Sequence, residues 1–235
     1  MKNTKLITII SQPRSGTNFI INNIIQKLDK VCICGELFFE KPYIPEKYYY
    51  HNMENEYTKQ DLIQRLLECC EEEYLVHKVF KDQVTDDEIR TLICHSDFVC
   101  FIMRNHIDRY ISNLKALKTS KFINYDYTGV KVEFNIEEFA SSMTDTNQWF
   151  QKTITLCDTI GKPTIVFDYD ELMRLTQREQ ILHCRDQLTQ LLGEELRIDY
   201  EKEHFTVTKQ DNSTSYSDMI SNYDEVKDVI ARLKS

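Results

Sequence analysis

Short apolar runs rich in β-branched residues alternate along this chain with longer segments in which apolar residues recur every three or four positions. Runs of the first kind predict buried strands, and segments of the second kind predict amphipathic helices. The predicted strands cover residues 5–11, 31–38, 74–80, 97–104 and 163–169, and the main predicted helices cover residues 19–28, 58–70, 86–95, 107–118, 136–160, 177–192 and 222–233. This alternation predicts an α/β fold: a P-loop-type domain with a central parallel sheet flanked by helices on both faces.

No repeat, low-complexity tract or linker interrupts this pattern, so we expect a single domain over residues 1–235. Hydrophobic residues make up 41% and charged residues 29% of the chain, which is typical of a globular protein. The 29 basic and 38 acidic residues give a net charge of −9. A field of that sign disfavours binding to nucleic acid, so any anionic ligand needs a locally basic pocket.

The sequence also bears on where the protein works. No apolar run approaches the roughly 20 residues that span a bilayer, and the apolar stretch at residues 6–10 is too short for a signal peptide. We therefore expect no membrane span and a cytoplasmic protein. Most of the eight cysteines sit in apolar runs, and their spacing does not match zinc-finger patterns. The sequence thus predicts free thiols in a reducing compartment and no metal site.

The most informative motif is SQPRSGTN, residues 11–18, between the first predicted strand and the first predicted helix. A strand that turns through small residues into a helix points several backbone N–H groups at one place, and an anion binds there. Gly16 allows close backbone approach, and Arg14 supplies a positive charge. The predicted phosphate ligands of this loop are Arg14, Ser15, Gly16, Thr17 and Asn18. An ordinary strand-to-helix turn is the alternative, and a Walker A motif is excluded because no lysine follows Gly16.

A second motif, RNHIDRYIS, begins at the end of the fourth predicted strand with Arg104 and ends at Ser112 in the next helix. The carboxyl ends of neighbouring parallel strands meet at one edge of a sheet, so Arg104 is expected to face the same ligand as the loop. An arginine there suits a second phosphate. The alternative is structural, with Arg104 capping a neighbouring helix and Ser112 lying at the surface.

Together these residues resemble a known family. SQPRSGTN resembles the 5′-phosphosulfate loop, and RNHIDRYIS resembles the 3′-phosphate motif, of sulfotransferases that use 3′-phosphoadenosine 5′-phosphosulfate. The likeness is nearest to the short bacterial carbohydrate and glycolipid sulfotransferases. It extends to residues 35–38 (GELF), Lys78, residues 167–172 (FDYDEL), and Lys209 with Gln210. One departure is His106, where the family often has proline.

The resemblance implies transfer of a sulfuryl group from that donor, as co-substrate, to a hydroxyl of a carbohydrate, glycolipid or small metabolite, without a metal ion. It implies that Arg14 binds the 5′-phosphate and stabilises charge on the leaving oxygen, while Arg104 and Ser112 bind the 3′-phosphate. Lys209 and Gln210 are implied in donor binding, where Lys209 would close over the nucleotide. A solvated loop lysine is the alternative for Lys209.

Glu36, at the carboxyl end of the second predicted strand, is the expected general base, a role that the resemblance also implies. Its rivals are His106 and His77, the latter expected on the opposite sheet face from Lys78. Lys78 is expected to be catalytic or to form a structural ion pair with Glu36, because a buried lysine needs a partner.

Two features bear on the acceptor. Trp149 lies away from the apolar stripe of its helix, so we expect it to pack under a loop or to contact a sugar or adenine. Tyrosines at positions 43, 48–50 and 57, with His51, are candidates for the lining of an acceptor cleft. The oligomeric state is not predicted.

Two other functions remain open at this point. A degenerate P-loop phosphotransferase should retain a lysine at the helix start and a magnesium-binding carboxylate. A catalytically inactive nucleotide-binding module is disfavoured by the presence of Glu36 and Arg14 but is not excluded.

Overall fold

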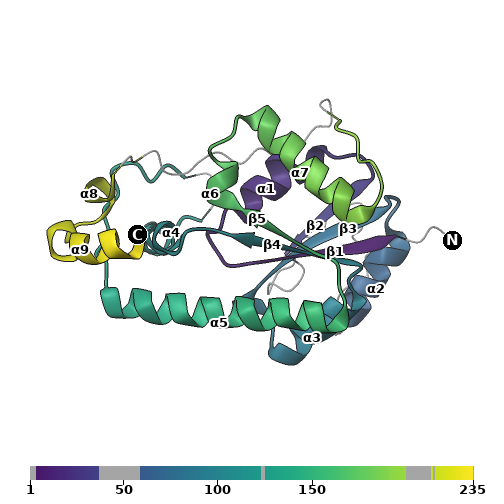
Figure 1. Cartoon of the computed structure of the whole chain (residues 1–235), viewed down its shortest axis with the longest axis horizontal. Helices are drawn as coiled ribbons and strands as arrows, with labels where there is room; N and C mark the ends of the chain where they lie inside the picture. The colour runs from purple at the N-terminus through teal and green to yellow at the C-terminus, as the bar shows by residue number, and fades with distance from the viewer. Residues whose placement is uncertain (1–3, 37–58, 123–124, 200–212, 214, 235) are drawn as a thin grey trace.

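The structure is a computed structural model that describes residues 4–36, 59–122, 125–199, 213 and 215–234 (Figure 1). Its five strands are β1 (Lys5–Ser11), β2 (Val31–Glu36), β3 (Tyr74–Phe80), β4 (Phe98–Met103) and β5 (Thr164–Asp168). The longer helices are α2 (Lys59–Cys69), α3 (Asp86–His95), α4 (His106–Thr119), α5 (Ile136–Ile160), α7 (Gln177–Leu192) and α9 (Tyr223–Lys234). The shorter ones are α1 (Thr17–Asn23), η1 (Ile25–Lys27), η3 (Lys81–Gln83), α6 (Tyr169–Leu172) and α8 (Tyr216–Met219).

The five strands form one parallel sheet in the order β2-β3-β1-β4-β5. This confirms the predicted α/β class with a central parallel sheet. β1 lies in the middle, between β3 and β4, so the loop after β1 has the ends of both neighbours beside it. The register aligns Ile9 of β1 with Lys78 of β3, and Lys78 in turn with Glu36 of β2. Lys78 and Glu36 therefore lie side by side on neighbouring strands, towards the carboxyl edge of the sheet.

Helices cover both faces of the sheet (Figure 1). On one face, α1 and α7 pack against residues such as Ile9, Val76 and Ile102. On the other face, α2, α3 and α5 pack against residues such as Ile10, Val79 and Phe101. Burial on both faces explains why the strands read as nearly continuous apolar runs. Within the described part of the chain, no helix is long and apolar enough to cross a membrane.

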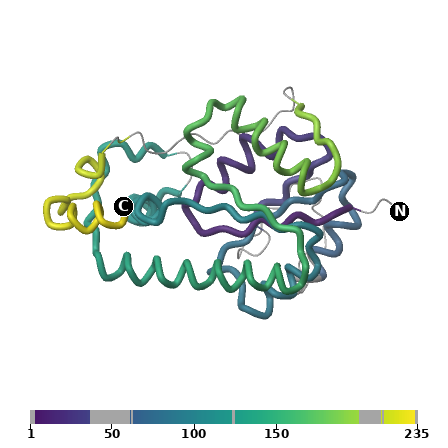
Figure 2. The backbone as a smooth tube through the Cα atoms, viewed as in Figure 1, coloured from purple at the N-terminus to yellow at the C-terminus, as the bar shows by residue number. Residues whose placement is uncertain are grey.

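A third apolar cluster lies beyond the carboxyl ends of the strands, where α4, α8 and α9 meet the start of α5 (Figure 2). Its largest members are aromatic: Tyr110 and Phe134 lie 5.2 Å apart between ring centroids, and Tyr110 and Phe139 lie 5.5 Å apart. The 25-residue helix α5 runs from this cluster to the sheet and joins the two. The cluster thereby fixes α4, which carries part of the predicted site, against the rest of the fold.

Trp149 on α5 lies in the core. It is 7% exposed and shares a cluster with Phe150, 5.3 Å away between ring centroids. Phe150 contacts Phe101 of β4, and α3 contributes to the same cluster beside α5. Because both the sheet and α3 pack against this part of α5, its apolar face is wider than one stripe. The expected contact of Trp149 with a sugar or adenine is therefore not supported by its position.

A buried polar network ties β1 and β3 together. His77 Nε2 and the Thr8 hydroxyl lie 2.7 Å apart, and the Thr8 hydroxyl lies 2.6 Å from the Ser96 hydroxyl. Burial lowers the pKa of His77 to about 3, so the folded protein holds this ring neutral. The unfolded chain has an ordinary histidine pKa of about 6.5.

We expect His77 to make the protein less stable as the pH falls from about 6.5 towards 3. In that window the unfolded chain takes up a proton that the folded chain does not, so the free energy of unfolding decreases by up to about 1.4 kcal/mol per pH unit from this group. Urea unfolding of the wild type and His77→Asn between pH 7 and pH 4.5 measures it, and the variant should have the shallower slope. Equal slopes would show that His77 is not held neutral.

Candidate active site at the carboxyl edge of the sheet

The loop after β1 has the backbone geometry of an anion cradle. Arg14 and Gly16 have φ angles of 70° and 77°, and Ser15 between them is not in this left-handed region. The Ser15 N–H donates to the Gln12 carbonyl at 3.2 Å, which closes a turn that includes Arg14. Left-handed residues that alternate with residues of negative φ direct backbone N–H groups into one concavity, which suits an anion. A left-handed arginine is uncommon, and such strain is concentrated at functional sites.

Side chains at the base of the loop anchor it to the sheet. The Thr17 hydroxyl donates to the Ser11 hydroxyl at 2.9 Å, and the Ser11 hydroxyl donates to the Ile102 carbonyl of β4 at 2.9 Å. Thr17 and Ser15 are both buried. The hydroxyl proton of Thr17, a predicted phosphate ligand, is thus directed at the sheet, and the main-chain N–H is what this residue offers to a ligand.

Tyr169, the first residue of α6 directly after β5, packs against Gly16. A Cβ atom at Gly16 would lie 2.1 Å from two carbon atoms of the Tyr169 ring, so no other residue fits there without displacing it. The Arg104 guanidinium lies over the same ring, 5.0 Å from its centroid. Tyr169 therefore contacts both the loop and the second predicted phosphate ligand, a role that the sequence did not reveal.

The two predicted phosphate motifs lie together. Arg104 Nη1 donates to the Arg14 carbonyl at 2.9 Å, and Arg14 Nε donates to the Ser112 hydroxyl at 3.2 Å. The Arg14 guanidinium also lies over the ring of Tyr127, 5.5 Å from its centroid. Its side chain thus reaches the hydroxyl predicted for the 3′-phosphate. Burial lowers the pKa of Arg14, and the charge of Arg104 acts in the same direction.

A third arginine, Arg109 on α4, adds positive charge beside Arg104. Its Nη2 donates to the hydroxyls of Ser142 (3.0 Å) and Thr146 (3.4 Å) on α5. Burial lowers the pKa of Arg109, and Arg104 contributes to that decrease. Sequence reasoning missed this residue, although it lies within the second motif.

Two of these guanidinium groups carry a buried nitrogen that lacks a hydrogen-bond partner among the described residues: Nε of Arg104 and Nε of Arg109. A buried charged donor without an acceptor is costly, and native proteins rarely leave one. The acid Asp170 lies within electrostatic range of Arg104, but its carboxylate accepts the Asn105 N–H at 2.6 Å. The unpaired donors fit an anionic ligand that supplies the acceptor oxygens.

Glu36, Lys78 and Asn18 form the other half of the site. Lys78 Nζ lies 2.8 Å from Glu36 Oε1 and also donates to Asn18 Oδ1 in the loop. The lysine side chain is 6% exposed and the glutamate side chain 26%. Burial lowers the pKa of Lys78, and the neighbouring Glu36 carboxylate opposes this shift. The expected ion pair is present, and it lies next to the loop after β1.

The two histidines considered as rival bases make other contacts. His77 is buried on the opposite face of β3 from Lys78, against Thr8. His106 Nε2 lies 2.8 Å from Asn147 Oδ1 on α5, and burial lowers its pKa. Glu36 is thus the predicted base that lies beside Lys78 and Asn18.

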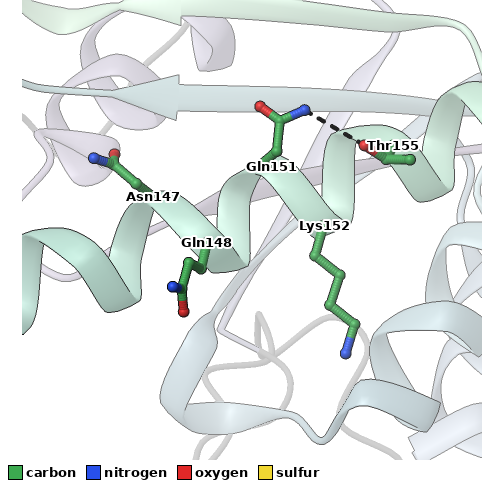
Figure 3. A pocket seen from close by; sticks show the side chains of 5 residues that line it. All are labelled: Asn147, Gln148, Gln151, Lys152 and Thr155. Atoms are coloured by element: carbon green, nitrogen blue, oxygen red, sulfur yellow. Dashed lines mark hydrogen bonds between the residues drawn. The ribbon is translucent and has the colours of Figure 1, made fainter.

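Other predictions fall outside this arrangement. Lys209, Gln210, the tyrosines at positions 43, 48–50 and 57, and His51 lie outside the residues that the structure describes. A hollow of about 630 Å³ on the exposed side of α5 is lined by Asn147, Gln148, Gln151, Lys152 and Thr155 (Figure 3). It contains none of the predicted site residues. In the described ranges, no group of three or more His, Cys, Asp and Glu residues is placed to hold a metal ion.

Comparisons with known proteins add no family to this picture. No protein-family model matches the chain, and no curated protein matches it at a significant level. The sulfotransferase resemblance therefore rests on the residues of the chain itself and stays a prediction.

Proposed function

We propose that this protein is a sulfotransferase that moves the sulfuryl group of 3′-phosphoadenosine 5′-phosphosulfate to a hydroxyl of a carbohydrate, glycolipid or small metabolite. The observation that carries the proposal is the pairing of two anion-binding features at one sheet edge. One is the left-handed loop around Arg14 and Gly16, and the other is Arg104 with its buried, unpaired Nε. A donor with separate 5′ and 3′ anionic groups suits two such features.

The geometry refines the roles within this proposal. The main-chain N–H groups of the loop hold the 5′-phosphosulfate. Arg14 contacts Ser112, so its guanidinium is assigned with Arg104 and Ser112 to the 3′-phosphate. Lys78 lies between Glu36 and Asn18, so it is the cation assigned to the leaving oxygen. These assignments move Arg14 away from the leaving-group role that the resemblance implies.

The proposed reaction is an in-line displacement. Glu36 accepts the proton of the acceptor hydroxyl as that oxygen forms a bond to sulfur. The bond from sulfur to the bridging phosphate oxygen breaks, and adenosine 3′,5′-bisphosphate leaves with the electron pair. Lys78 and the loop N–H groups stabilise the charge on that oxygen, and no metal ion takes part. Positioning and charge stabilisation thus supply most of the catalysis, as in phosphoryl transfer.

Arg104→Ala tests the 3′-phosphate assignment. We expect it to weaken binding of adenosine 3′,5′-bisphosphate by about 1.5–3 kcal/mol, the usual worth of a hydrogen bond to a charged group, which corresponds to about 10- to 150-fold in Kd. Titration calorimetry with that nucleotide and with AMP measures the difference.

AMP lacks the 3′-phosphate, so its affinity serves as the control. Arg104 also donates to the Arg14 carbonyl, and any general disturbance of the loop would weaken both nucleotides. An equal loss for the two nucleotides would contradict the assignment of Arg104.

A further inference from the structure

Gln83, in the short helix η3 directly after β3, links the end of that strand to Glu36. Its Nε2 donates to Glu36 Oε2 at 2.9 Å, and its Oε1 accepts the Phe80 N–H at 3.0 Å. No sequence motif singled out this residue. It contacts the carboxylate oxygen that Lys78 does not hold, because Lys78 Nζ lies 2.8 Å from Oε1.

The orientation of this amide is fixed by its surroundings. A backbone N–H donates and does not accept, so the Gln83 atom that faces Phe80 must be the carbonyl oxygen. The amino group therefore faces Glu36, where it meets an acceptor. The usual ambiguity between the oxygen and nitrogen of a glutamine side chain is thereby resolved. Glu36 thus receives an N–H donor that is itself anchored to the backbone of β3.

Two donors from β3 and the turn after it hold the two carboxylate oxygens of Glu36. Glu36 is the last residue of the edge strand β2, and a single ion pair would leave its carboxylate free to rotate about that contact. The second donor fixes the plane of the carboxylate. Each oxygen has two lone-pair positions, so each keeps one for another donor. A general base works only within about 3 Å of its proton in a defined direction.

We infer that Gln83 is a positioning residue that holds Glu36 in the orientation needed to accept the proton of the acceptor hydroxyl. This inference rests on the proposed function. It adds that Gln83 acts on turnover through Glu36 and leaves donor binding to the loop and the arginines.

Two substitutions separate this role from a structural one. Gln83→Met keeps the length of the side chain and removes both hydrogen bonds. Gln83→Glu keeps an oxygen for the Phe80 N–H and places a second carboxylate against Glu36. Gln64→Met is the matched control, since Gln64 Nε2 donates to Glu68 Oε1 at 2.9 Å on the exposed surface of α2.

The readouts are the Kd of adenosine 3′,5′-bisphosphate and the release of labelled sulfate from 3′-phosphoadenosine 5′-phosphosulfate with water as acceptor. We expect both Gln83 variants to keep Kd within about twofold and to lose roughly tenfold or more in kcat, since small misplacements of a reacting group are costly.

Lowering the pH should restore part of the activity of Gln83→Glu relative to wild type, because the protonated carboxyl introduced at position 83 can donate to Glu36. The same change of pH should not restore the activity of Gln83→Met. In a Glu36→Gln background, Gln83→Met should cost nothing further.

Several results would overturn the inference. Wild-type kcat in both Gln83 variants would do so, as would a loss of donor affinity as large as the loss of kcat. A wild type that does not bind the nucleotide would instead overturn the proposed function, and the inference with it. If the nucleotide binds but water is too poor an acceptor for turnover, the Glu36 carboxyl signal in ¹³C NMR decides: a narrow wild-type signal should broaden in Gln83→Met, and an unchanged signal would reject the role.

Discussion

Glu36→Gln is expected to lower turnover by roughly 10²-fold or more while leaving the affinity for the donor nucleotide unchanged, because a positioned general base usually contributes that much. The amide has the size of the carboxylate and still offers its oxygen to Lys78, so the contact with Lys78 should persist, although the new amino group would face that of Gln83 and lose this hydrogen bond. It cannot accept the proton of the acceptor hydroxyl. Turnover and nucleotide affinity are measured side by side on the purified variant.

Glu68→Gln, on the exposed face of α2, is the control for removal of a carboxylate elsewhere. It should leave both quantities unchanged. Unchanged turnover in Glu36→Gln would reject Glu36 as the base and return attention to His77 and His106. The structure argues against His77 as the base, because this histidine is buried on the other side of the sheet.

Gly16→Ala is expected to disrupt the phosphate loop. The residue has a φ of 77°, and the added methyl group would lie 2.1 Å from the Tyr169 ring. The left-handed backbone costs about 1–2 kcal/mol for alanine, and overpacking costs about 1–3 kcal/mol more. We therefore expect the free energy of unfolding to fall by about 2–5 kcal/mol. Donor affinity should fall at least about tenfold, the equivalent of one lost charge-assisted hydrogen bond.

Gly193→Ala is the matched control. Gly193 has a φ of 71° at the end of α7, and nothing lies within 4 Å of the added Cβ position. It should show only the backbone cost of about 1–2 kcal/mol, with nucleotide binding intact. Urea unfolding and calorimetry on both variants separate the two effects. Similar losses in both would show that the contact with Tyr169 does not shape the loop.

The sequence predicts the secondary structure well where elements are long or buried. All five strands are present, because each is a short apolar run, and the three central strands β1, β3 and β4 are almost entirely buried. The first helix begins at Thr17, earlier than predicted, and gives way to a 3₁₀ turn at Ile25–Lys27. The four-residue helices α6 and α8 were missed, since so short a segment shows no helical period.

The candidate site was predicted in its parts but not in its connections. Parallel strands imply that the ends of β1 and β4 share an edge, so Arg104 was correctly expected beside the loop. The order of all five strands is not encoded in a local pattern, so most contacts that depend on it were not foreseen, apart from the ion pair of Glu36 and Lys78. The packing of Tyr169 on Gly16 and the hydrogen bond from Gln83 to Glu36 both depend on that order. Arg109 was overlooked because its hydrogen bonds to Ser142 and Thr146 depend on the packing of α4 against α5.

Titration calorimetry of the wild-type protein with adenosine 3′,5′-bisphosphate and with ATP, each with and without EDTA, tests the central claim most directly. The proposed donor site predicts tighter binding of the bisphosphate, because its 3′-phosphate meets Arg104 and Ser112, and the same affinity after chelation. Binding of ATP as tight as that of the bisphosphate, or loss of nucleotide binding in EDTA, would contradict it.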